Sequence, residues 1–166
     1  SSLPLIKINN LSEHILTPKI SFRVNPGNNM KNHSNADKIL SASNAFAINR
    51  LGISDSFESG RSLTLGLDYK VNYTNNDNDN DKDNDNDIGE KVKPDRYLEF
   101  KLATVIRDKV EKNIPLKSTI DKKNSNLFGS IQSNLFENVI IGYDFSIDND
   151  YKTFESHSLN TEFSIN

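Results

Sequence analysis

The sequence predicts an all-β protein, an antiparallel up-and-down segment of a transmembrane β-barrel (a partial barrel) with about six to seven strands. Residues 62–73 alternate six apolar side chains with five polar ones and a glycine, so a strand there has one apolar and one polar face. Such segments run to about 11 residues, roughly twice a typical soluble strand and enough to cross a bilayer at a tilt. The chain has no run of about 18 apolar residues, which excludes a transmembrane helix.

The same alternation predicts the remaining strands. They are expected at 14–24, 97–107, 126–133, 138–148 and 156–165, with the end of another at Leu3–Ile8 before an Asn9-Asn10 turn. The segment 126–133 is the weakest, because Phe128 and Gly129 blur its two faces. Two connections are long, 25–62 and 107–125, whereas 134–138 and 148–154 are tight links. Outer-membrane barrels show this inequality, with long outer loops and short periplasmic turns.

The composition suits a barrel wall better than a large soluble core. Only 34% of the 166 residues are hydrophobic and 24 are Asn, which a barrel tolerates because its inner side is polar. The chain begins with Ser1 and ends inside an alternating run, so we expect residues 1–166 to be part of a single barrel domain in a longer protein. The absence of cysteine excludes disulfides and thiolate chemistry.

The Asn/Asp-rich segment 75–87 is predicted to be a disordered turn between two strands, since a polar low-complexity run buries too little apolar surface to become ordered. Residues 75–90 carry a charge of −6, which leaves +3 elsewhere, and neither part is basic enough for nucleic acid. A calcium loop starting at Asp79 is the alternative. Its acidic residues have EF-hand spacing, but Asn84 replaces the required glycine and no helices flank it, so we predict no metal site.

Catalytic chemistry has no support in the sequence. His14, His33 and His157 are scattered, without a second histidine or a carboxylate at metal spacing. Acidic pairs such as Asp55 with Glu58 are more simply loop charges than acid/base couples. We therefore predict no catalytic residue, no cofactor and no enzymatic activity.

Two other classes of protein share the alternation. A soluble β-sandwich binding module alternates because its apolar faces are buried between two sheets. Another outer-membrane barrel, such as a porin, has the same strand pattern. Strand length favours a membrane barrel over the sandwich, but periodicity does not separate one class of barrel from another.

A motif at 44–67 is more specific. The residues that define it are Arg50, Gly52, Asp55, Glu58, Gly60, Arg61, Gly66 and Leu67, in a pattern that begins Phe-x-x-(Asp/Asn)-Arg. This block resembles the C-terminal barrel region of the LPS-assembly outer-membrane protein family, LptD, also called organic solvent tolerance protein. Asn49 and Ser56 depart from the residues usual there, Asp and Arg.

Weaker matches extend the resemblance over essentially the whole chain, apart from the Asn/Asp tract. Upstream, Pro4-Leu5-Ile6 and Leu16-Thr17-Pro18 are similar to two strands of the family, with Thr17 in place of Glu. Downstream, residues 98–107 keep the arginine of a family strand as Arg107, while Ala103 and Thr104 replace a Gly-Gln pair. Residues 126–129 are similar to the start of the next strand.

The resemblance implies a protein of the cell outer membrane that inserts lipopolysaccharide into the outer leaflet. The implied partners are lipopolysaccharide, a plug lipoprotein and periplasmic bridge proteins. Side chains expected to meet lipid are Leu65, Leu67, Tyr69, Val71, Ile141, Tyr143 and Phe145; candidate lumen-facing residues are Thr64, Asp68, Lys70, Glu99, Lys101, Asp144 and Glu162. We therefore expect arginine to be costlier at Leu67 or Ile141 than at Thr64 or Ser146.

Overall fold

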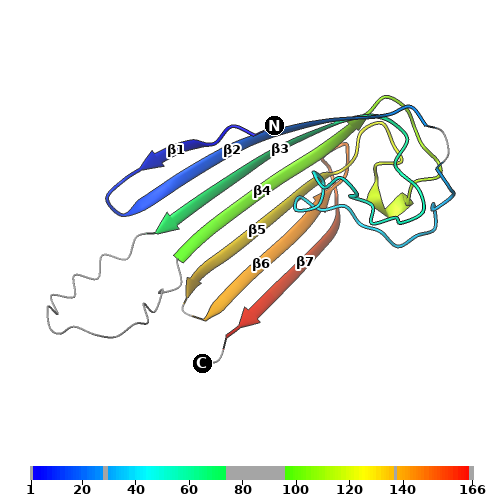
Figure 1. The fold of residues 1–166 in the computed structure, drawn as a ribbon. Helices are drawn as coiled ribbons and strands as arrows, with labels where there is room; N and C mark the ends of the chain where they lie inside the picture. The colour runs from blue at the N-terminus through cyan, green and yellow to red at the C-terminus, as the bar shows by residue number, and fades with distance from the viewer. Residues whose placement is uncertain (1, 28–29, 74–95, 137, 165–166) are drawn as a thin grey trace, which may run out of the picture.

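The computed structural model describes residues 2–27, 30–73, 96–136 and 138–164. Within them the chain forms one open sheet of seven antiparallel strands in sequence order (Figure 1). The strands are β1 Leu5–Ile8, β2 Ser12–Asn25, β3 Gly60–Tyr73, β4 Arg96–Arg107, β5 Leu127–Phe136, β6 Val139–Ile147 and β7 Phe154–Phe163, with a three-residue 3-10 helix, η1, at Leu116–Ser118. The predicted all-β, up-and-down fold is confirmed, and the strand ends differ from the predicted ones by only a few residues.

The strands are long. β2 and β3 each have 14 residues and are paired along their whole length, from Ser12 opposite Tyr73 to Asn25 opposite Gly60. β4 continues the ladder with Leu102 opposite Leu67. No helical segment of the described chain has the length and apolarity that a membrane span requires.

Pro18 lies inside β2, where a proline would normally remove a ladder hydrogen bond. The carbonyl of Pro18 accepts a hydrogen bond from the Leu3 N–H. In an antiparallel strand the N–H and C=O of one residue point to the same neighbour, so the missing N–H also points to the β1 side. β1 is only four residues long and pairs with residues 13–16 of β2, so the proline costs no β2–β3 bond.

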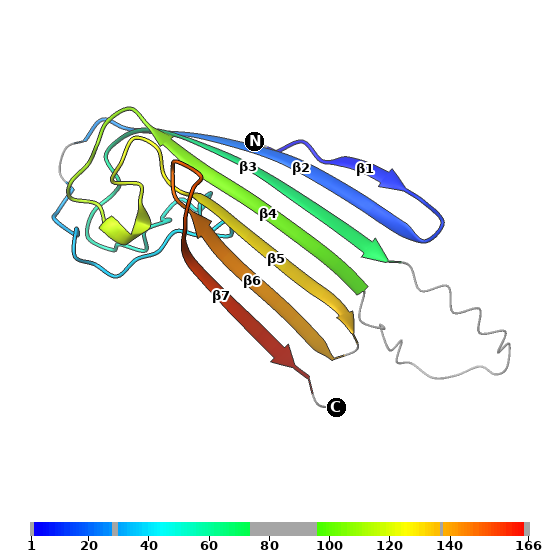
Figure 2. The same ribbon diagram turned by 180° about the vertical axis from the view of Figure 1, so that it is seen from behind.

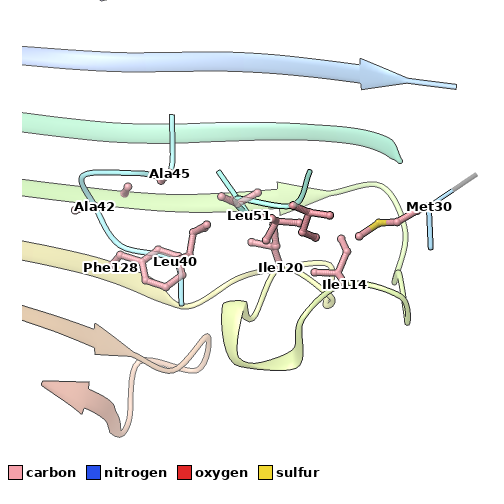
Figure 3. Close-up of a cluster of buried hydrophobic side chains, with 11 residues drawn as sticks. Met30, Leu40, Ala42, Ala45, Leu51, Ile114, Ile120 and Phe128 are labelled. Carbon is pink, nitrogen blue, oxygen red and sulfur yellow. The ribbon is translucent and has the colours of Figure 1, made fainter. Parts of the chain in front are cut away.

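The two long loops, 26–59 and 108–126, leave the same end of the sheet and fold against one of its faces (Figures 1 and 2). We call this the loop face. It includes Gly66 of β3, Ala103 and Val105 of β4, and Phe128 of β5. These sheet residues and the two loops enclose a buried apolar cluster (Figure 3), which consists of Met30, Leu40, Ala42, Ala45, Leu51, Ile53, Ala103, Val105, Ile114, Ile120 and Phe128.

The opposite face, which we call the apolar face, carries large exposed hydrophobic side chains. Phe22 of β2 is 68% exposed and Leu159 of β7 is 70% exposed, and Leu65, Ile131 and Ile141 lie on the strands between them. A β-sandwich would cover such a face with a second sheet. Among the described residues the strands form a single sheet, and its apolar face stays uncovered.

β5 has the weakest alternation of apolar and polar residues in the sequence, and the contacts on its two faces explain why. Phe128 points to the loop face and is part of the buried cluster. Gly129 points to the apolar face, where a Cβ on it would lie 2.0 Å from the ring of Phe145, so this ring lies directly over the glycine. Both residues fit one alternating strand, although the sequence alone blurred its faces.

One sequence-based expectation is wrong. We expected arginine to cost less at Thr64 and Ser146 than at Leu67 and Ile141, because both lie on the polar face of their predicted strands. Both residues do point to the loop face, but they are only 3% and 6% exposed and their hydroxyls are hydrogen bonded to Arg50 and Asn126. Arginine would therefore be costly there too. Ile165, which was assigned to the last strand, and the tract 75–87 lie outside the described residues.

Candidate functional site

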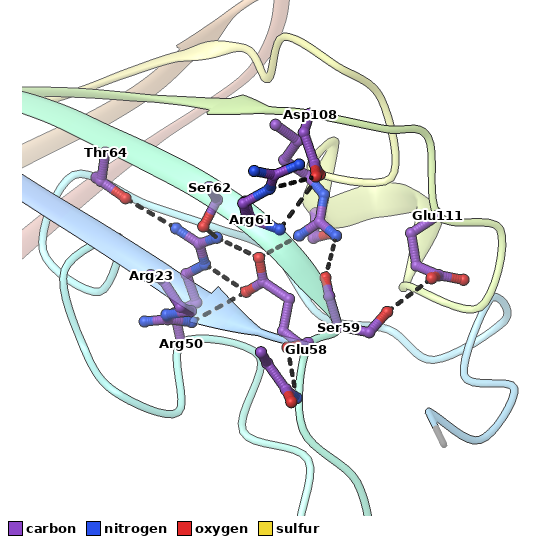
Figure 4. Close-up of polar contacts among 12 residues, drawn as sticks. Arg23, Arg50, Glu58, Ser59, Arg61, Ser62, Thr64, Asp108 and Glu111 are labelled. Atoms are coloured by element: carbon purple, nitrogen blue, oxygen red, sulfur yellow. Dashed lines mark hydrogen bonds and ion pairs between the residues drawn. The ribbon is translucent and has the colours of Figure 1, made fainter. Parts of the chain in front are cut away.

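The most concentrated polar chemistry lies where the β2–β3 loop meets the loop face. Three arginines from three separate segments surround one carboxylate (Figure 4). We call Arg23, Arg50, Glu58 and Arg107 the arginine cluster. Arg23 is near the end of β2, Arg107 ends β4, and Arg50 and Glu58 belong to the loop just before β3.

Arg50 is the most fully used member of the arginine cluster. Its side chain is completely buried. Its Nε donates to Glu58 Oε2 at 2.8 Å, its Nη1 donates to the Thr64 hydroxyl at 2.9 Å, and its Nη2 donates to the Ser62 hydroxyl at 3.0 Å and to Glu58 Oε1. The loop is thereby joined to two side chains of β3.

Glu58 receives all three guanidinium groups. Arg23 Nη1 donates to its Oε2 at 3.0 Å, and Arg107 Nη1 donates to its Oε1. Burial by itself would raise the pKa of Glu58, but the hydrogen bond and charge of Arg50, followed by the charges of Arg107 and Arg23, outweigh it and hold the pKa below its ordinary value. The carboxylate therefore stays charged at neutral pH in a nearly dry place.

Arg107 extends the network to the second loop. Its Nη2 donates to the carbonyl of Ser59 at 2.6 Å, and the Ser59 hydroxyl donates to Glu111 Oε2 at 2.8 Å. Glu111 also accepts the backbone N–H of Asn113 at 3.2 Å. The ends of β2, β3 and β4 and both long loops thus share one continuous set of polar contacts.

Two glycines allow the close approach on which this arrangement depends. A Cβ on Gly66 would lie 2.6 Å from the ring of Phe46, which is in the β2–β3 loop, and 2.9 Å from the carbonyl oxygen of Leu102. Gly60 begins β3 with a φ of +86°, a conformation that other residues rarely adopt. Glycine is therefore required at both positions for steric reasons.

Comparison with known protein families identifies the family of this chain. The family model for LptD, described as LPS transport system D, matches residues 3–166. The chain belongs to the LptD family. No curated protein and no solved structure matches it. At the family level its role is in lipopolysaccharide transport and outer-membrane assembly, as the resemblance of the 44–67 motif implied.

The LptD-like motif residues divide into two groups in space. Arg50, Glu58, Gly60 and Gly66 lie in the arginine cluster or support it. Asp55, Arg61 and Gly52 lie outside it, and Leu67 points to the opposite, apolar face. Asp55 contacts Lys31 Nζ at 3.2 Å and His33 Nε2 at 2.8 Å, and these contacts, led by the hydrogen bond from Lys31, lower its pKa.

Arg61 and Gly52 also lie outside the arginine cluster. Arg61 Nε lies 3.2 Å from Asp108 Oδ2, which joins the start of β3 to the β4–β5 loop. Gly52 has a φ of +61° in a turn. Neither contacts Glu58, so the structure does not bring the whole motif into one site.

The residues predicted to face a lumen all point to the loop face of this LptD-family sheet. Thr64 is buried beside Arg50, as described above. Asp68 is paired with Lys19, and Glu99 lies 2.8 Å from Lys101. Lys70 Nζ lies 4.9 Å from the centre of the Tyr97 ring. Asp144 and Glu162 line a separate groove on the same face, over β5 to β7.

Sequence reasoning missed several members of the network. Arg107 was identified only as a retained family arginine, and Arg23, Ser59 and Glu111 were not singled out. The available signal was that Arg23 and Arg107 each lie at the loop end of a strand, on the same face as the polar residues of β3.

The arrangement is suited to holding chain segments together. Every charged group in it is engaged with another group of the protein, and the described residues contain no group of three or more histidine or acidic side chains that could hold a metal. The arginine cluster therefore fixes the two loops to the sheet.

Proposed function

We propose that this chain forms part of the wall of an outer-membrane barrel through which lipopolysaccharide is inserted into the outer leaflet. The observation that carries the proposal is the division between the two faces of one sheet. One face is uncovered and apolar, and the other is polar and has two loops fixed to it. Membership of the LptD family indicates that the transported molecule is lipopolysaccharide. The difference between the two faces is what a segment with lipid on one side and a wet interior on the other requires.

The strand lengths support the same proposal. β2 to β7 have between 9 and 14 residues, whereas a tilted strand needs about 9 to 11 to cross the hydrocarbon core. On the apolar face, Leu65, Leu67, Tyr69, Ile141, Tyr143 and Phe145 would contact lipid. Val71 was also expected there, but it is only 5% exposed, so that expectation is wrong. The loop face would then border the interior, with Asp68, Lys70, Glu99, Lys101, Asp144 and Glu162 along it.

The arginine cluster has a defined part in this proposal. Both long loops leave the same end of the sheet, and the cluster holds them against the inner surface. In an outer-membrane barrel the long loops are on the cell exterior, so the cluster would keep the outer end of the wall partly closed. The plug lipoprotein and the periplasmic bridge proteins would be partners of the complete protein.

The test is reconstitution of the complete protein with its lipoprotein and bridge partners in proteoliposomes. Labelled lipopolysaccharide should reach the proteoliposomes in a protein-dependent way. Ion conductance without any transfer would instead support the porin alternative, and a protein that stays soluble without detergent would support the β-sandwich.

A further inference from the structure

A polar groove lies on the loop face of β5, β6 and β7, away from the arginine cluster. Its volume is about 270 Å³. Gly142 of β6 forms its floor, between Gln132 on β5 and Asn160 on β7. A Cβ on Gly142 would meet nothing closer than Asn160 at 3.9 Å, so the space above the floor is open.

The charges around the groove differ from those on the neighbouring strands. On β2, β3 and β4 two of the three acidic groups of the loop face have cationic partners, Asp68 with Lys19 and Glu99 with Lys101, and the third, Glu13, accepts a hydrogen bond from Asn72 at 3.0 Å. In the described part of the chain, Asp144 and Glu162 have no ion-pair partner, and both line the groove. Two carboxylates are thus left with free acceptor oxygens.

The groups that line the groove indicate what it can bind. Carboxylates, side-chain amides and the hydroxyls of Ser43 and Ser130 can accept from or donate to ligand hydroxyl groups. The lining has no aromatic, methionine or arginine side chain, the anchors that are typical of a protein–protein interface. Its two carboxylates would repel phosphate.

We propose that this groove contacts the uncharged, hydroxyl-rich part of the lipopolysaccharide saccharide, and not its phosphorylated part. The inference rests on the proposed function and adds to it a position on the wall and a chemical preference. Because the groove has no aromatic surface for stacking, each contact with the saccharide is weak. Weak contacts are suited to a saccharide that has to leave the groove during transport.

The first experiment uses the complete reconstituted protein and two probes. One is lipopolysaccharide with a long uncharged saccharide, and the other is lipopolysaccharide truncated to its phosphorylated core. Gly142→Trp, which fills the groove, should alter the transfer rate of the long form several-fold and leave that of the truncated form unchanged. Gly142→Ala is the matched control and should change neither rate.

The outcomes separate the two proposals. If the unmodified protein transfers neither probe, the proposed function fails. If it transfers both, and Gly142→Trp has no effect or affects the two probes equally, the groove inference alone is overturned.

A second measurement does not depend on transfer. A benzophenone amino acid at Gln132 should crosslink to the saccharide, whereas the same group at Ser133, the next residue on the opposite face, should not. Saccharide crosslinks that are absent from both positions, or equal at both, would also overturn the groove assignment.

Discussion

The ring of Phe46, in the β2–β3 loop, lies against Gly66, in the middle of β3, so closely that a Cβ on Gly66 would be only 2.6 Å from it. This contact lets a long loop lie flat on the sheet. The buried apolar cluster beneath the loops, against which Phe46 packs, depends on the same approach.

Replacing Gly66 with valine should therefore destabilise the protein by about 1–3 kcal/mol, the usual cost of overpacking. The added side chain would meet both the Phe46 ring and the Leu102 carbonyl oxygen, and the latter is backbone that cannot rotate away. Urea unfolding of the complete protein in liposomes measures the change. Gly142→Val is the matched control, because its Cβ meets open space; equal losses for the two variants would contradict the steric account.

Glu58→Gln should destabilise the folded state by about 3–5 kcal/mol, because it leaves three guanidinium groups near one another without their shared carboxylate. Protease sensitivity of the β2–β3 loop should rise together with the loss in urea stability. Asp55→Asn is the control, since Asp55 is an exposed carboxylate in the same loop. A variant at Glu58 no more sensitive than the one at Asp55 would show that the cluster does not hold the loop.

Loop attachment should also depend on acid. The folded-state pKa of Glu58 lies below its ordinary value of 4.5, so its contribution is complete above that pH and is lost as the pH falls through the lower, folded-state value. Limited proteolysis with an acid-active protease should show the loop released in this range. In Glu58→Gln the same acid-dependent release should be absent, and its persistence would assign the effect to another group.

The two faces of the sheet should respond differently to arginine. Ile141→Arg, or Leu67→Arg, should cost about 2–4 kcal/mol if the site is near the bilayer midplane, since an ion is then forced towards hydrocarbon. Gln132 is a better control than Thr64 or Ser146, because it is on the loop face at nearly the same level and is only half-buried. Similar costs for Ile141→Arg and Gln132→Arg in a liposome folding titration would rule out the proposed facing.

Deleting residues 75–87 and joining Thr74 to Ile88 should leave assembly and lipopolysaccharide export unchanged. The segment connects β3 to β4, and each doubling of a flexible connection costs only about 0.6 kcal/mol. Export by the deleted and intact complete proteins should be compared with and without calcium. Impaired export, or calcium-dependent stabilisation of the intact form alone, would reveal a function of the tract.

The alternation of apolar and polar residues was sufficient to predict the strands of the sheet. The alternation of residues 62–73 predicted β3 and its two faces, because side-chain direction in a strand follows from the backbone of that strand alone. The positions of the loops were not predictable in this way. Thr64 was expected to be wet because it is polar, but it is buried by a loop whose contacts join residues far apart in sequence.

The same limit applies to the candidate site. Arg50 and Glu58 were found because they belong to a local motif. Arg23 and Arg107 reach Glu58 across 35 and 49 residues, and the sequence offered no measure of which polar residue on one strand would meet which loop. Gly129 was ambiguous for a similar reason, since the Phe145 ring that covers it belongs to the next strand.

The contact between Glu58 and Arg107 has a consequence for the order of folding. Arg50 can bond to Ser62 and Thr64 as soon as β3 forms, since all three are close in the chain. Arg107 arrives only with β4, after the 74–95 connection has been closed at an entropic cost. The β2–β3 loop therefore becomes fully fixed only when the next strand has paired, so the pairing of β4 and the final attachment of this loop are a single event.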